Sequence, residues 1–261
     1  MEHHPGTHEM GSTVSTLDTV GAVFFVLWTV AMWAAVFVIA YSNRRPARPW
    51  AYRTAVGVIG IGVVGQIGHF QEHVAQAGYW VLNPMEPAWM TPWGDSLARG
   101  LGQIDPSKPS LGMELLHLKG NLVFLAGLVG IALVTRRLTR DLRTRRWAKM
   151  GVWMQGVHGV EHLVLTLSVV LGASTAIGLS TWFGTIEAGP ALTTYRVWWH
   201  FVANLVGTFI LAMAVYHMWR ERRVIEASYG IPPAGRGGDL DGAAARALPV
   251  ERQPQPARRR D

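Results

Sequence analysis

Apolar residues occur along this chain in long unbroken blocks rather than in the stripes of an amphipathic surface helix. A helix of roughly 20 residues crosses a hydrocarbon core of about 30 Å, and five blocks reach that length, at approximately 18–41, 54–82, 113–135, 149–173 and 196–218. The first block follows a polar leader and shows no small-residue cleavage pattern, so it is expected to be retained as a span. The pattern predicts an all-α integral membrane protein with five transmembrane helices.

The orientation follows from the basic residues that flank these blocks, because Lys and Arg near helix ends remain on the cytoplasmic side. The connections after the first and third blocks and the segment after the fifth are strongly basic, whereas the other two connections are nearly balanced. This predicts a plasma-membrane protein with the N-terminus outside and the C-terminus in the cytoplasm. The basic residues are Arg44, Arg45, Arg48, Arg53, Arg136, Arg137, Arg140, Arg143, Arg145, Arg146, Lys149, Arg220, Arg222 and Arg223.

The composition excludes several kinds of site but does not identify a function. The formal net charge of +7 is mostly explained by the flanks of the spans, so no nucleic-acid partner is expected. The chain has no cysteine, which excludes disulfides and thiolate metal sites. We divide it into an outer leader (1–17), a membrane domain (18–228) and a disordered cytoplasmic tail (229–261) rich in Pro, Gly, Ala and Arg.

Two parts of the membrane domain share a polar pattern. "QIGHFQEH" from Gln66 and "QGVHGVEH" from Gln155 both read Q-x-x-H-x-x-E-H, and "HLKGN" and "HFVAN" both read H-x-x-x-N. Six polar identities in the same order indicate an internal duplication, with one repeat over 54–135 and the other over 149–218. The spans of the two repeats should form a four-helix bundle with a pseudo-twofold axis along the membrane normal, and the first span is additional.

The polar residues of each motif lie on one helix face, since they are spaced three, four or seven residues apart. At 1.5 Å rise per residue, His73 and His162 fall roughly 15 Å inside the outer ends of their spans, and Asn121 and Asn204 reach a similar depth. All of them are therefore expected in one layer, from the bilayer middle to its outer half. Ionisable groups at that depth are costly and normally mark a functional site.

Six imidazoles and two carboxylates in one layer predict a binuclear transition-metal site, because imidazole suits Zn, Cu and Fe. Iron is favoured, because two six-coordinate irons would keep positions open for water, hydroxide or dioxygen. Glu72 and Glu161 are also the candidate catalytic carboxylates. The amides one turn away, Gln66, Gln155, Asn121 and Asn204, are expected to orient the imidazoles or to hold a bound water. The predicted ligands are His69, Glu72, His73, His117, His158, Glu161, His162 and His200.

This arrangement resembles, in its chemistry, the integral-membrane di-iron hydroxylases and desaturases, which ring two irons with histidines from a helical bundle. Those families use H-x-x-H-H and H-x-x-x-H boxes, whereas this chain carries H-x-x-E-H twice. The resemblance implies an iron-dependent oxidoreductase that acts on a hydrophobic or lipid-like substrate in the membrane, with electrons from an external donor.

Four other interpretations stay open. The histidines could be hydrogen-bonded core residues, axial ligands of haem b, the site of a divalent-metal transporter, or the zinc ligands of a lipid hydrolase with a glutamate as base. The first outer connection, "YWVLNPMEPAWMTPWGD", could be a lid, a substrate mouth or an interfacial aromatic belt. His3, His4 and His8 could deliver metal to an outward-facing site.

Overall fold

A computed structural model describes residues 14–46, 48–84, 86, 89–139, 141–187 and 189–232. Across these residues it contains helices and no strand. The long helices are α1 (Thr16–Ser42), α2 (Pro49–Leu82), α4 (Leu111–Val134), α5 (Arg143–Val170) and α6 (Pro190–Ala227). Two short helices, α3 (Pro92–Gly102) and the 3-10 helix η1 (Leu179–Gly184), lie in the connections before α4 and α6.

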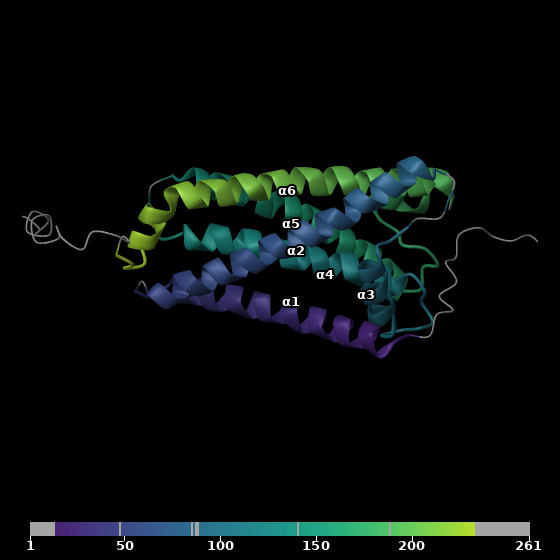
Figure 1. The fold of residues 1–261 in the computed structure, drawn as a ribbon, viewed down its shortest axis with the longest axis horizontal. Coiled ribbons are helices and arrows are strands. Elements are labelled where there is room, and N and C mark those ends of the chain that lie inside the picture. The colour runs from purple at the N-terminus through teal and green to yellow at the C-terminus, as the bar shows by residue number, and fades with distance from the viewer. Residues whose placement is uncertain are drawn as a thin grey trace, which may run out of the picture.

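The long helices lie side by side along the molecule (Figure 1). Both α2 and α5 pack against α4 and α6, which makes a four-helix bundle, while α1 packs outside it on α2 and α4. We call α2 and α4 the first helix pair, and α5 and α6 the second. The arginine-rich end of the bundle holds the α1–α2 and α4–α5 connections and the C-terminal end of α6; the opposite end is the α3 end.

Local sequence signals set the helix ends. Proline stands at the start of α2, α3 and α6, where its missing N–H costs no intrahelical bond. Ser15 caps α1 in a reciprocal arrangement with Asp18. The Asp18 carboxylate is buried and accepts hydrogen bonds from the Arg99 guanidinium, at 3.1 and 3.2 Å, which ties α1 to α3.

Four helices are long and apolar enough to cross a membrane: α1, α2, α4 and α6. The fifth predicted span corresponds to α5, a 28-residue helix that does not meet the same standard of apolarity among the described residues. Gln155, His158, Glu161 and His162 account for this, because they place four polar side chains within two turns of that helix. The chain is thus an all-helical protein with four candidate membrane-spanning helices.

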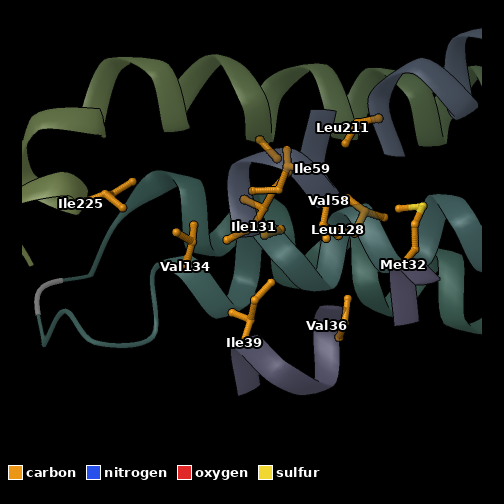
Figure 2. Close-up of a cluster of buried hydrophobic side chains, with 14 of the residues drawn as sticks. Met32, Val36, Ile39, Val58, Ile59, Leu128, Ile131, Val134, Leu211 and Ile225 are labelled. Atoms are coloured by element: carbon orange, nitrogen blue, oxygen red, sulfur yellow. The ribbon is translucent and has the colours of Figure 1, made fainter. Parts of the chain in front are cut away.

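The apolar core fills the half of the bundle toward the arginine-rich end (Figure 2). Met32, Val36 and Ile39 of α1 face side chains of α2, α4 and α6 there, including Ile59, Ile131 and Leu211. The backbones of α2 and α4 approach closely, since a Cβ added at Gly62 would lie 2.7 Å from the Gly127 Cα atom. Small residues at such crossings are typical of membrane helix packing.

The ends of the chain depart from the predicted boundaries in one place. Tyr229, which the sequence assigns to the tail, is buried, and its hydroxyl donates to the Asn43 side-chain oxygen at 3.1 Å. The outer leader up to residue 13, including His3, His4 and His8, and the tail from residue 233 lie outside the described residues. The first outer connection contains α3, a helix that the sequence reading did not predict.

Candidate functional site

The structure brings all six predicted histidine ligands together in the half of the bundle toward the α3 end. We call this group the histidine cluster: His69 and His73 of α2, His117 of α4, His158 and His162 of α5, and His200 of α6. Within the cluster, nine pairs of rings have centroids 4.7 to 6.1 Å apart. Every long helix except α1 therefore contributes to one site.

Two of the three ring distances within each helix pair match those of the other pair, while the third is 5.7 Å for His73–His117 and 5.2 Å for His162–His200. His69 lies 4.8 Å from His73 and 6.1 Å from His117. In the second pair, His158 lies 4.7 Å from His162 and 6.1 Å from His200. We call these two groups of three rings the first and second triads.

Rings of the two triads also stack on each other across the bundle. The planes of His73 and His200 are 11° apart with centroids at 5.6 Å, and those of His117 and His162 are 6° apart at 5.5 Å. Each of these two contacts joins one ring from the first helix pair to one from the second, and His73 and His117 stack within the first pair, 28° apart at 5.7 Å. The cluster is thus continuous across the bundle.

Hydrogen bonds at Nδ1 fix the tautomer of three rings. His117 Nδ1 donates to the Met113 carbonyl at 2.9 Å, and His200 Nδ1 donates to the Arg196 carbonyl at 2.7 Å. His73 Nδ1 donates to Gln76 Oε1 at 3.0 Å. A backbone carbonyl or amide oxygen only accepts, so the Nε2 atom of each of these rings carries a lone pair. This is how metal-binding histidines are usually held. The lone pair of His73 accepts a hydrogen bond from His69 Nε2–H at 2.9 Å.

Several ring nitrogens of the cluster are buried without any hydrogen-bond partner. They are His69 Nδ1, His158 Nε2, His162 Nδ1, His162 Nε2 and His200 Nε2. Leaving a buried donor or acceptor unpaired costs about 1–3 kcal/mol. Five such atoms lie in this one cluster, and water or a metal ion could bind imidazole nitrogen there.

The closest two rings of each triad, 4.8 and 4.7 Å apart, are spaced like two imidazoles that bind one ion. With a Zn–N bond of about 2.1 Å, two imidazoles bound tetrahedrally to one ion have centroids about 5 Å apart. As the side chains stand, no group of three or more His, Asp or Glu residues in the described ranges is arranged to hold a metal ion. Each triad would need its rings to turn so that three nitrogens converge.

The two glutamates bind the connections at the α3 end rather than the histidine rings. Glu72 accepts from the Thr91 backbone N–H at 2.9 Å and from the Thr91 hydroxyl at the start of α3. Glu161 accepts from the Leu179 and Ser180 N–H groups at 2.9 and 2.7 Å, at the start of η1. Each carboxylate thus anchors a connection 18 or 19 residues further along the chain.

Glycines make room for these carboxylates. A Cβ at Gly94 would lie 3.0 Å from Glu72 Oε2, and one at Gly178 would lie 2.9 Å from Glu161 Oε1. Gln76 also donates to Glu72 Oε1 at 3.3 Å while it accepts from His73, so it links the anchor of the first helix pair to the histidine cluster.

The predicted orienting amides pair with each other across the bundle. Gln66 Nε2 donates to Asn204 Oδ1 at 3.2 Å, and Gln155 Nε2 donates to Asn121 Oδ1. Both asparagines donate to the carbonyl of the histidine one turn earlier, at 2.9 and 3.0 Å. None of the four side chains hydrogen-bonds an imidazole. They join the first helix pair to the second directly behind the histidine cluster.

Sequence reasoning missed a buried ion pair beside the cluster. Glu114 is 1% exposed, and its Oε1 atom accepts from the Arg196 guanidinium at 3.0 Å. Its other oxygen is buried without a partner. Glu114 lies three residues before His117, and Arg196 lies four residues before His200. Each charged residue is therefore on the same helix face as the histidine that follows it, and this spacing could have predicted the ion pair.

Aromatic rings connect the surface of the α3 end with the turn that precedes His200. Trp182, which is half exposed, lies 5.8 Å from Tyr195, and Tyr195 lies 5.9 Å from Trp199. Trp182 and Phe183 both adopt positive φ, at 48° and 54°. Bulky residues rarely adopt this conformation, which is often found near functional sites.

Comparison with known proteins places the chain in a family but not with a characterised relative. No curated protein matches it, and no solved structure does either. The family model that matches is described as "Family of unknown function (DUF6008)", and the match covers residues 1–259. Because it spans nearly the whole chain, this protein belongs to the DUF6008 family.

Proposed function

We propose that this protein is a membrane-embedded oxidoreductase with two transition-metal ions, one bound by each triad of the histidine cluster. The observation that carries the proposal is the gathering of six imidazoles with five buried ring nitrogens that lack a partner. In a purely structural cluster these nitrogens would need other partners, whereas metal coordination would satisfy one nitrogen of each ring, including one of the two on His162. Three protein ligands per ion also leave coordination positions open for a substrate.

The ligand chemistry shifts the expected metal from iron toward copper. Iron is expected from a ligand set of six histidines and two glutamates that leaves coordination positions open, but Glu72 and Glu161 are engaged with backbone N–H groups. A set of neutral imidazoles suits copper, zinc and iron, and among divalent ions copper binds such sites most tightly. An iron site with a carboxylate ligand would require a glutamate to leave its connection.

Two such ions supply electron-transfer chemistry toward dioxygen or an oxidisable hydrophobic molecule. The surrounding residues hold the rings: Met113, Arg196 and Gln76 fix three Nδ1–H groups and direct Nε2 into the cluster. The row of Trp182, Tyr195 and Trp199 offers a route for electrons from an external donor. Access from the bilayer suits a lipid-like substrate.

We further propose that α5 is a fifth span and that the two helix pairs arose by duplication. Lys108, just before α4, donates to the carbonyl of Val170 at the end of α5 at 2.6 Å, so α5 extends as far as α4 does. The matched ring distances and the paired Glu anchors support the duplication. With the basic connections in the cytoplasm, the histidine cluster lies in the outer half of the plasma membrane and the N-terminus outside.

The rival functions fit the geometry less well. Axial imidazoles approach a haem iron from opposite faces of a flat macrocycle, whereas four rings of this cluster are stacked face to face in two pairs. A zinc hydrolase needs a carboxylate free to act as base, and both candidate carboxylates already accept two or more hydrogen bonds.

Elemental analysis of the full-length protein purified from membranes tests the proposal. We expect close to two transition-metal ions per chain and an optical spectrum without a Soret band. His162→Ala should lower the metal content to one ion or fewer. The matched control is His217→Ala, a buried histidine of α6 outside the cluster, which should retain both ions.

Metal-free protein from metal-supplied cells, or equal metal loss in the two variants, would contradict the proposal. A Soret band would favour haem b instead. Two zinc ions in a redox-inactive protein would retain the metal site but reject the oxidoreductase.

A further inference from the structure

An open cavity lies at the arginine-rich end of the bundle, away from the histidine cluster. It has a volume of about 350 Å³ and lies between the start of α5 and the C-terminal half of α6. Two arginines, one histidine and two apolar side chains line it: Arg143, Arg146, Trp147, Met213 and His217. Nothing in the proposed redox function uses these residues.

The charge of this cavity is positive. Among the described residues the Arg143 guanidinium has no hydrogen bond or ion pair, while Arg146 pairs with Asp141 at the surface. The other nearby carboxylate, Glu221, accepts from the backbone N–H groups of Arg143 and Thr144, both at 3.2 Å, and thereby caps α5. The Arg143 guanidinium therefore remains available to an anion, together with the Arg146 Nη1 group, which Asp141 does not engage.

One wall of the cavity is apolar and continues along the lipid-facing surface. Trp147 packs edge-on against Phe209 with ring centroids 5.9 Å apart, and Phe209 is largely exposed on α6. Met213 lies one turn from Phe209 on the same helix, between it and His217. A ligand in the cavity would thus contact the cationic groups with one end and the apolar side chains with the rest of its length.

We propose that this cavity binds the phosphate of an anionic phospholipid, with its acyl chain along Trp147, Met213 and Phe209. Guanidinium groups bind phosphate oxygens through charge-assisted hydrogen bonds. Basic pockets between membrane helices on the cytoplasmic side are typical sites for anionic headgroups. The position at the arginine-rich end agrees with the leaflet that carries these lipids.

Lipid binding to the purified full-length protein tests this. In nanodiscs or detergent with phosphatidylglycerol or phosphatidylcholine, we expect native mass spectrometry to show preferential retention of phosphatidylglycerol. Arg143→Gln and Arg146→Gln should each weaken it about fivefold, since a basic residue near an anionic lipid contributes about 1 kcal/mol. Arg223→Gln, an exposed arginine of α6 outside the cavity, is the matched control.

Two further measurements distinguish a lipid phosphate from free inorganic phosphate. Trp147→Ala should weaken retention of the long-chain lipid but not binding of inorganic phosphate. Displacement of the lipid by millimolar inorganic phosphate, with Trp147→Ala without effect, would show a free-phosphate site and overturn the proposal. Equal retention of the two lipids, or equal loss in Arg143→Gln and Arg223→Gln, would overturn it as well.

Discussion

At the scale of single residues, Glu72 and Glu161 show what a motif leaves undetermined. The H-x-x-E-H spacing correctly places the histidines on the face of one cluster, because 100° per residue fixes direction around the helix. The same spacing says nothing about unpaired backbone N–H groups 18 or 19 residues away, and both carboxylates bind those groups. The partner of a polar side chain depends on loop structure that periodicity does not contain.

Glu161→Ala separates an anchor from a ligand. Removal of the carboxylate should free the Leu179 and Ser180 amides, and a hydrogen bond to a charged group contributes about 1.5–3 kcal/mol. Amide exchange in the segment of η1 should therefore become at least roughly tenfold faster by hydrogen–deuterium exchange, while the metal content stays unchanged. Glu187→Ala, an exposed glutamate in the same connection, is the control. Loss of metal with unaltered amide exchange would show that Glu161 is a metal ligand and not an anchor.

At the scale of helices, the sequence predicts the long helices, whose existence depends on the length of an apolar block. It does not predict a short helix whose existence depends on local packing. The apolar blocks gave α1, α2, α4 and α6, and the motif-bearing block gave α5. The eleven-residue α3 was not predicted, since Pro92, Gly94, Gly100 and Gly102 read as a loop. It exists because Glu72, Asp18 and α4 hold it: a Cβ at Gly100 would lie 2.1 Å from the Asp18 carbonyl oxygen.

Two glycines of α2 provide a matched test of the helix packing. Gly62→Ala places a methyl group 2.7 Å from Gly127 Cα, so α2 and α4 must separate. Overpacking of this kind costs about 1–3 kcal/mol in the free energy of unfolding. Gly60→Ala meets nothing within 4 Å and should be neutral or slightly stabilising. Unfolding in mixed micelles measures both, and equal effects would show that the close crossing is not needed.

At the scale of the whole molecule, polar and apolar layers divide the bundle. The core of Figure 2 fills the half toward the arginine-rich end, and the histidine cluster fills the other half. The rise per residue predicts that the histidines lie at one level along the bundle, and their rings do gather there. The sequence could not predict that Gln66 pairs with Asn204 and Gln155 with Asn121, because those contacts depend on which helices become neighbours.

The absence of cysteine makes the number of spans measurable with single introduced thiols. We expect Ser107→Cys and Ser174→Cys to react with an impermeant maleimide on intact cells, and Thr139→Cys only after permeabilisation. All three positions are exposed, in the connections around α4 and α5. Ser174→Cys that behaves like Thr139→Cys would show that α5 does not cross the membrane. A reversed pattern for all three would invert the orientation.

The two Gln–Asn pairs have a consequence for electronic behaviour. Each triad belongs to one helix pair, so its own ring distances survive if the two pairs slide against each other. The separation between the triads does not survive, because it is set across the bundle by Gln66–Asn204 and Gln155–Asn121. These four amides, none of which touches an imidazole, would therefore decide whether two bound ions are magnetically coupled and exchange electrons two at a time, or act as independent one-electron centres.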